Sequence, residues 1–134
     1  MKSTPISNVM TKNVVSVTPE QKIIDVKHIY EKKEFHHHIP VVANNKLVGM
    51  VSLIDFMYHI KGAGLSDTNK VYTELTVKDI MTENPFSLTP NAFIEEAARE
   101  LAKGTYHAIP IIDGGTLVGI LSTADVIRHA LQSE

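Results

Sequence analysis

Two short segments of the chain carry side chains whose types and spacing suit the binding of a sugar or a phosphate. Ser52 precedes Asp55 by three residues, and Ser122 precedes Asp125 by the same interval. An ionised carboxylate offers two acceptor oxygens, which match the two hydroxyls of a cis diol such as that of ribose. A phosphate nearby would use the serine hydroxyl and the N-terminus of the helix that each segment is expected to begin.

The same spacing also has a purely structural interpretation. Ser-x-x-Asp ahead of an apolar run is typical of a capping box, in which the serine caps the helix and the aspartate lies near its positive end. The two interpretations are compatible, because a serine can cap the helix in the free protein and contact a ligand in the bound one. The residues alone leave both open.

Both segments belong to a longer repeat. Each begins with a glycine, Gly49 or Gly119, and the residues on both sides recur at offsets of 70 or 71. The recurring pairs are Val9-Met10-Thr11 with Ile80-Met81-Thr82, Val17-Thr18-Pro19 with Leu88-Thr89-Pro90, Ile39-Pro40 with Ile109-Pro110, and His59 with His129. One copy of about 60 residues is marginal for a hydrophobic core. We therefore expect two half-domains that pack on each other about a pseudo-two-fold axis.

The elements that must position these residues follow the order β-α-β-β-α in each copy. Apolar periodicity, β-branched runs and turn residues predict strands at 14–18, 40–42, 46–52, 85–89, 109–112 and 117–121, and helices at 21–33, 53–61, 91–103 and 124–131. Asn44-Asn45 and Gly114-Gly115 are the expected hairpin turns. The fold class is α+β (mixed α/β), with small sheets and helices on their outer face. Repeats are expected at 7–61 and 76–131, with a polar linker at 62–75.

Composition excludes several classes of protein. The 134 residues carry a net charge of -2 with both signs mixed along the chain, which argues against nucleic-acid binding. No stretch approaches the roughly 18 apolar residues of a membrane helix, and no signal peptide is expected. The chain has no Cys and no nucleophile, phosphate-loop or metalloprotease motif, so we expect a cytoplasmic protein that is not an enzyme.

The repeated Met-Thr, Thr-Pro, Ile-Pro and Gly-x-x-Ser-x-x-Asp motifs, in this order over residues 7–131, resemble the CBS domain family. The specific resemblance is to a tandem pair, or Bateman module, which would occupy residues 1–134 and leave no room for a catalytic domain. The resemblance implies a regulatory sensor of adenosine-containing ligands: AMP, ADP, ATP, S-adenosylmethionine or NAD. It also implies a homodimer and an unknown effector protein that reads a ligand-dependent change of conformation. No cofactor is required beyond this regulatory ligand.

Carried over by position, the resemblance implies two sets of ligand-binding residues. The ribose and phosphate would meet Ser52, Asp55, Ser122 and Asp125, together with Thr18 and Thr89 of the cleft wall. The adenine and phosphate would meet the loops before the Ile-Pro strands, at His37, His38, Ile39, Pro40, His107, Ile109 and Pro110. His37 and His38 would face the site of Asp125, and His107 that of Asp55. Many relatives have Arg here, so His in its place makes tight triphosphate binding doubtful and phosphate affinity dependent on pH.

Two alternatives to the sensor remain open. The chain is an interaction scaffold with empty clefts, or His36 and His38 bind zinc with His107 or a carboxylate. Adjacent histidines on an extended loop diverge, so His37 would not join them. The candidates for packing between repeats or protomers are Phe56, Met57, Ile60, Val126, Ile127 and Leu131, and part of this list is expected to be core.

Overall fold

The computed structural model describes residues 3–32 and 37–132 and divides into two compact units. One unit comprises Val15–Asn84, here called the β1–β2 unit. The other, the β4–β5 unit, joins the segment up to Val14 with Pro85–Glu134. The compact units are therefore not the two sequence repeats, because each repeat gives its first segment to the other unit.

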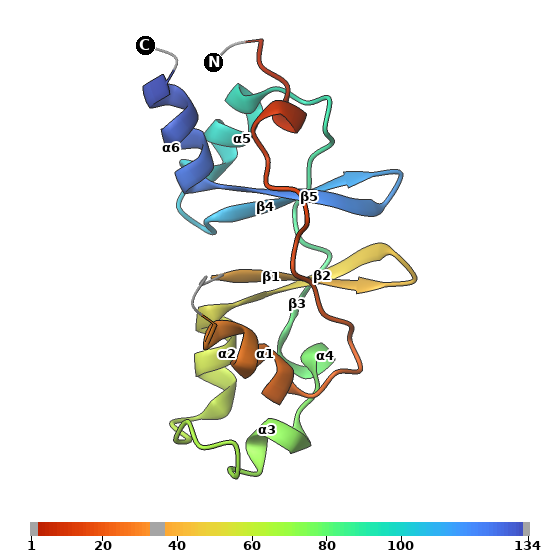
Figure 1. Ribbon diagram of the computed structural model, residues 1–134, viewed down its shortest axis with the longest axis vertical. Helices are drawn as coiled ribbons and strands as arrows, with labels where there is room; N and C mark the ends of the chain where they lie inside the picture. The colour runs from red at the N-terminus through yellow and green to blue at the C-terminus, as the bar shows by residue number, and fades with distance from the viewer. Residues whose placement is uncertain (1–2, 33–36, 133–134) are drawn as a thin grey trace. The chain divides into compact units, whose positions relative to one another are not determined.

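The β1–β2 unit is built on an antiparallel hairpin. Strand β1 (His38–Ala43) pairs with β2 (Lys46–Ser52), with Pro40 opposite Met50. Asn44 and Asn45 close the hairpin with positive φ angles of 51° and 65°, as predicted. The remaining elements are α1 (Ile23–Tyr30), α2 (Leu53–Ile60), α3 (Val71–Glu74), α4 (Val77–Ile80) and β3 (Thr82–Glu83), which pairs with β2. The helices α1 and α2 lie on one face of the hairpin (Figure 1).

The β4–β5 unit repeats this plan. Strand β4 (Ala108–Asp113) pairs with β5 (Thr116–Ser122) across Gly114 and Gly115, whose φ angles are 59° and 86°. The other elements are the short 3₁₀ helix η1 (Ile6–Asn8), α5 (Ile94–Leu101) and α6 (Thr123–Gln132). Thr11 pairs with Ile120 on β5, as β3 pairs with β2 in the first unit. The mixed α/β class and the antiparallel hairpins predicted from the sequence are confirmed.

The strands predicted at 14–18 and 85–89 are wrong in extent. Each reduces to one parallel bridge, from Val17 to Val41 and from Leu88 to Ile111. Val17 donates its N–H to the Pro40 carbonyl at 3.1 Å and accepts from Val42 at 2.8 Å. The chain then turns at Thr18, whose N–H donates to Gln21 Oε1 at 2.7 Å, so pairing goes no further.

The helices predicted at 21–33 and 91–103 are shorter in the structure. Helix α1 begins at Ile23 and α5 at Ile94, after Lys22 and Phe93, which are extended. Helix α1 ends at Tyr30, and the last residue of its predicted span, Lys33, lies outside the described residues. Both predicted helices begin too early, because their first residues form the tight turns that end the preceding segments.

The connection between the repeats, residues 62–75, contains more structure than a linker. It includes α3, and the Tyr72 ring of that helix is fully buried. Tyr72 stacks on Phe56 with ring centroids 6.1 Å apart and donates its hydroxyl to the Gly64 carbonyl at 2.7 Å. Because the residues around Tyr72 are polar, the sequence analysis did not predict that Tyr72 is a core residue.

Most of the buried positions in the two cores are equivalent in the repeat. The β1–β2 unit buries Val17, Ile23, Val26, Ile39, Val41, Val51, Phe56, Ile60, Tyr72, Val77 and Ile80. The β4–β5 unit buries Ile6, Leu88, Ile94, Ala97, Leu101, Ile109, Ile111, Leu121 and Val126. Phe56, Ile60 and Val126, which were expected to pack between repeats or protomers, are core residues. Met57, Ile127 and Leu131 are exposed.

Each Met-Thr motif packs on the recurring glycine, Gly49 or Gly119, in the hairpin of the unit to which the motif belongs. A Cβ added at Gly49 would lie 2.5 Å from Met81 Sδ and 3.1 Å from the Thr82 carbonyl oxygen. A Cβ at Gly119 would lie 2.5 Å from Met10 Sδ and 3.0 Å from the Thr11 carbonyl oxygen. Glycine is therefore needed at both positions for the close approach of another backbone. In the described part of the chain, no helix is sufficiently long and apolar to cross a membrane.

Candidate functional site

The two Ser-x-x-Asp segments form the predicted capping boxes. Ser52 precedes the first residue of α2; its Oγ accepts from the Asp55 N–H at 3.0 Å, and its own N–H donates to Asp55 Oδ2 at 3.1 Å. Ser122 and Asp125 make the same two bonds at the start of α6, at 3.1 Å and 2.9 Å. The structural interpretation of the spacing is confirmed, and it places an acidic side chain at each helix N-terminus.

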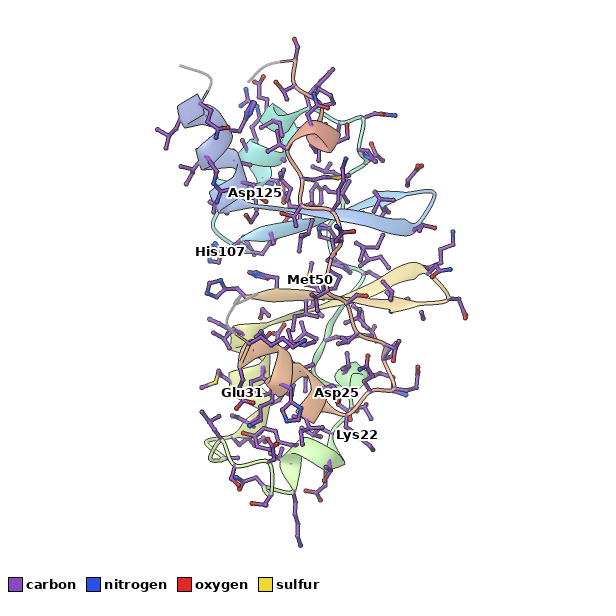
Figure 2. All side chains as sticks on the ribbon, in the orientation of Figure 1. Lys22, Asp25, Glu31, Met50, His107 and Asp125 are labelled. Carbon is purple, nitrogen blue, oxygen red and sulfur yellow. The ribbon has the colours of Figure 1, made fainter. Side chains whose placement is uncertain are left out.

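The loop before each hairpin lies against the helix start of its own unit. Leu53 donates its N–H to the His37 carbonyl at 2.9 Å, and Thr123 donates to the His107 carbonyl at the same distance. The side chains of His37 and His107 are exposed, and that of His38 is half-buried. Figure 2 shows His107 just before β4 and Asp125 at the start of α6. The backbone thus brings each predicted histidine loop to a predicted Ser-Asp pair.

These pairings are within a unit: His37 accompanies Asp55, and His107 accompanies Asp125. The expectation that His37 and His38 face Asp125, and that His107 faces Asp55, joins residues of different units. It stays a prediction.

The Ile-Pro residues of both repeats are buried near the start of the two hairpins. Ile39 and Ile109 are fully buried in the two cores, and Pro40 and Pro110 are buried beside them. The Pro40 and Pro110 carbonyls accept from Val17 and Leu88 at 3.1 Å and 3.2 Å. These residues connect each hairpin to the segment that precedes it, and their expected contact with a ligand stays a prediction.

Thr18 and Thr89 are exposed and directly follow the residues that bridge to the hairpins. Their backbones form tight turns: the Thr18 N–H donates to the Gln21 side chain, and the Thr89 carbonyl accepts from the Ala92 N–H at 3.1 Å. Their expected role in the wall of a ligand site stays a prediction.

Two residues near the aspartates were missed by the sequence analysis. The Thr82 hydroxyl, on β3, lies 3.5 Å from Asp55 Oδ2. Arg128 donates from Nη1 to Asp125 Oδ1 at 3.1 Å. The recurrence of Thr11 as Thr82 was a usable signal, and so was a cation three residues after Asp125 on one helix face.

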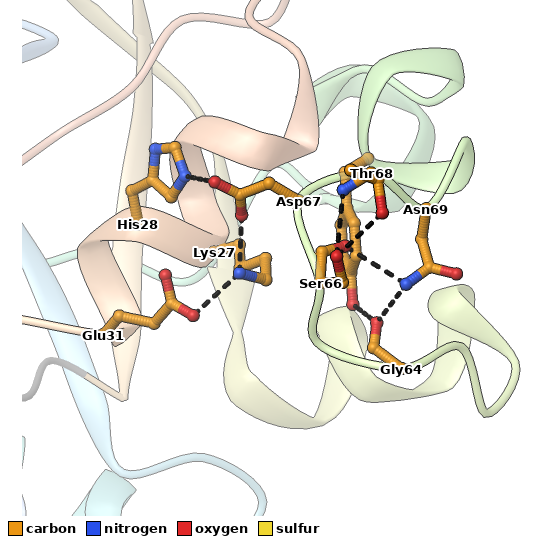
Figure 3. A network of polar contacts seen from close by, with 9 residues as sticks. Lys27, His28, Glu31, Gly64, Ser66, Asp67, Thr68 and Asn69 are labelled. Atoms are coloured by element: carbon orange, nitrogen blue, oxygen red, sulfur yellow. Dashed lines mark hydrogen bonds and ion pairs between the residues drawn. The ribbon is translucent and has the colours of Figure 1, made fainter.

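The histidine-based zinc site is not tested, because His36 lies outside the described residues. A different group of possible metal ligands occurs in the β1–β2 unit. One ligand atom each from His28, Glu31 and Asp67 lies within 4.8 Å of the others. However, the buried Lys27 ammonium already lies 2.7 Å from both Glu31 Oε2 and Asp67 Oδ1 (Figure 3). A cation is therefore present at this cluster, and the cluster is an ion-pair network rather than a metal site.

The electrostatics of this network are consistent with a structural role. The hydrogen bond from Lys27 and the contact with His28 at 2.9 Å hold the pKa of Asp67 below its usual value. Asp67 and Glu31 in turn raise the pKa of Lys27. The Lys27 ammonium also lies 5.5 Å from the Tyr72 ring centroid. The network ties α1 to the segment that connects the two repeats.

Comparison with known proteins identifies relatives over nearly the whole chain. A family model described as the CBS domain matches residues 6–62 and again 77–132. The uncharacterized protein MJ0188 of Methanocaldococcus jannaschii is 34% identical over 131 residues, which cover 97% of this chain. The chloroplastic CBS domain-containing protein CBSX2 of Arabidopsis thaliana is 31% identical over 144 residues, which cover 90% of this chain. The chain spans 45% of the length of the first and 60% of the second.

Among solved structures, a crystal structure of CBSX2 in complex with AMP matches with a TM-score of 0.81 and 30% sequence identity. The match covers 96% of this chain and 97% of that one. The similarity therefore extends over both hairpins and all the helices that carry the Ser-Asp pairs.

Proposed function

Because the chain belongs to the CBS domain family, as a tandem pair, we propose that it is a regulatory module that binds an adenosine-containing ligand. Asp55 and Asp125 accept hydrogen bonds from the hydroxyls of a ribose, and the N-terminus of α2 or α6 binds a phosphate. The chain has no catalytic role in this proposal. It acts on a partner protein through a shift between conformations that the ligand stabilises unequally.

The observation that carries the proposal is that both Ser-Asp pairs are intact and placed alike. Each lies at the start of a helix of eight or more residues, beside the carbonyl of a histidine in the preceding loop. CBSX2, with which the whole fold compares, was crystallised with AMP. Two equivalent half-sites support binding of one or two ligands per chain.

A third aspartate in the chain separates capping from ligand binding. Asp79 accepts from the Thr76 N–H at 2.9 Å at the start of α4, as Asp55 and Asp125 accept from their serines. It caps a helix of four residues and has no place in the proposed sites. Its substitution therefore reports what the loss of a capping carboxylate does by itself.

The test is calorimetric titration with AMP, ADP, ATP, NAD and S-adenosylmethionine. It uses the unsubstituted chain and the Asp55→Asn, Asp125→Asn, double and Asp79→Asn variants. We expect at least one ligand to bind, each site variant to lose one site or weaken it, and Asp79→Asn to bind like the parent. A ligand at 100 times its dissociation constant should also add about 2.7 kcal/mol to the free energy of unfolding.

Absence of binding for every ligand at millimolar concentration would reject the proposal in favour of a scaffold with empty clefts. A zinc titration in the same series tests the His36 and His38 alternative, because zinc binding lost in the His36→Ala/His38→Ala double variant would support a metal sensor.

We also propose that the chain forms a homodimer through the exposed apolar residues of α2 and α6. Met57, Ile127 and Leu131 are 53%, 55% and 67% exposed, respectively. Ile54 and Tyr58, at 77% and 74%, extend the apolar surface of α2. Burial of such side chains is favourable, and Met57→Lys or Ile127→Lys should therefore shift sedimentation toward the monomer. An unchanged molar mass would exclude these faces as the contact.

A further inference from the structure

The two half-sites differ at the position three residues after the aspartate. In α6 this residue is Arg128, and in α2 it is Tyr58. Arg128 Nη1 lies 3.1 Å from Asp125 Oδ1, with side-chain exposures of 64% for the arginine and 13% for the aspartate. Side chains on a helix lean toward its N-terminus, so the guanidinium lies near the start of α6.

Arg128 changes the number of acceptor positions that the aspartate has free. Asp125 uses Oδ2 for the Ser122 N–H and Oδ1 for Arg128. Asp55 uses Oδ2 for the Ser52 N–H and the weak Thr82 contact, and no donor among the described residues reaches its Oδ1. A cis diol brings two donors, so at Asp125 it must displace or share Arg128, whereas at Asp55 one oxygen is open.

We propose that Arg128 is a specificity-determining residue that makes the Asp125 half-site select phosphate-bearing adenosine ligands over neutral nucleosides. This inference rests on the proposed function and names the ligand class that one of its two sites prefers. A neutral nucleoside that takes Asp125 Oδ1 leaves the guanidinium without its anion. A nucleotide supplies a new anion, and arginine binds phosphate through two parallel hydrogen bonds.

The half-site at Asp55 lacks this selection. The equivalent residue there, Tyr58, is 74% exposed and has a phenol in place of the guanidinium. Arg128 places a guanidinium within one turn of the proposed ribose position at Asp125. The Asp125 half-site therefore prefers an adenosine ligand that carries a phosphate, whereas the Asp55 half-site has no such preference.

The experiment measures adenosine and AMP affinities by calorimetry at one half-site at a time. Asp55→Asn isolates the Asp125 half-site, and Asp125→Asn isolates the Asp55 half-site. In the Asp55→Asn background we expect Arg128→Ala to lower the ratio of AMP to adenosine affinity about tenfold, with adenosine binding unchanged or tighter. Arg128→Lys should restore part of the ratio, since lysine keeps the charge without the planar fork.

The control and the reciprocal change use the same titrations. Arg99→Ala removes an exposed arginine of the same unit that pairs with Glu95 at 2.6 Å, and it should leave the ratio unchanged. In the Asp125→Asn background, Tyr58→Arg should raise the ratio at the Asp55 half-site, whereas Arg128→Ala should not alter it.

Equal weakening of adenosine and AMP by Arg128→Ala, or an unchanged ratio, would overturn the inference and leave Arg128 a structural partner of Asp125. The proposed function would survive that result, because AMP would still bind and still depend on the aspartates. Absence of AMP and adenosine binding in the parent chain would overturn the inference. It would overturn the proposed function as well only if ADP, ATP, NAD and S-adenosylmethionine also fail to bind. Circular dichroism and melting curves of each variant separate these outcomes from loss of folding.

Discussion

The two units share the same bridged hairpin, but different side chains fill their cores. In both, a hairpin is bridged on one side by the residue before Thr-Pro and on the other by a Met-Thr segment from the opposite repeat. In the β1–β2 unit, Phe56 contacts Tyr30 at 5.4 Å between centroids and stacks on Tyr72. The position of Phe56 is held by Val126 in the β4–β5 unit, and the position equivalent to Tyr72 is Met1, outside the described residues.

This difference shows that the repeat gives the two units the same topology but not the same side-chain contacts. The connection between the repeats enlarges one core and adds the Lys27 network to it, while the other unit carries the Arg128 pair at its helix start. We therefore expect unequal stability and unequal ligand preference from two units of the same plan. Four predictions test that comparison.

The largest effect should come from Tyr72→Ala. The side chain is fully buried and its loss leaves a cavity beside Phe56, which should lower the free energy of unfolding of the β1–β2 unit by about 3–5 kcal/mol. Chemical denaturation and hydrogen exchange at β2 and β5 would measure it separately in the two units. Thr73→Ala, one residue along and exposed, is the matched control. A cost below about 1 kcal/mol would mean that residues 62–75 are a linker after all.

Gly49→Ala and Gly119→Ala should each cost about 1–3 kcal/mol, because the added methyl meets both a methionine sulfur and a backbone carbonyl. Similar losses of stability would confirm that the two Met-Thr segments make equivalent contacts in their units. Gly64→Ala is the control, since its nearest contact is at an ordinary 3.7 Å. If only one of the two substitutions destabilises the protein, the two units differ in the contacts of their hairpins as well as in their core side chains.

Removal of the capping serines should have a smaller effect. Ser52→Ala and Ser122→Ala each remove one hydrogen bond to the third residue of a helix, and each should lower stability by about 0.5–2 kcal/mol. Thermal denaturation with Ser16→Ala as an exposed control gives the comparison. No loss in either variant would contradict the capping role.

The smallest effect concerns pH. Lys27 and then His28 lower the pKa of Asp67, so its contribution is present above the usual carboxyl pKa of about 4 and is lost as pH falls through the lowered value. The raised pKa of Lys27 preserves the pair at neutral and moderately alkaline pH. Melting curves of the parent and Asp67→Asn should differ at pH 7 and converge near pH 2. A constant difference over this range would mean that the carboxylate charge contributes nothing.

Much of the fold could be predicted from the residues. Both hairpins, their turns and the helices at their ends follow from β-branched runs and from Asn or Gly pairs that tolerate positive φ. Ser52 with Asp55 and Ser122 with Asp125 were predicted as capping pairs, because that chemistry is complete within four residues. Strands 14–18 and 85–89 were overestimated, since a β-branched run carries no record of how many partners its backbone will find.

The sequence by itself determined the repeat, the local elements and the two acidic helix starts, which depend on interactions between near neighbours. Only the tertiary structure decided that Ile6 packs with the second hairpin and Val77 and Ile80 with the first, that Tyr72 is a core residue, and that Ile39 and Ile109 are buried. The physical reason is that burial depends on the total apolar surface that distant segments can remove from water together, and no local pattern records which segments those are.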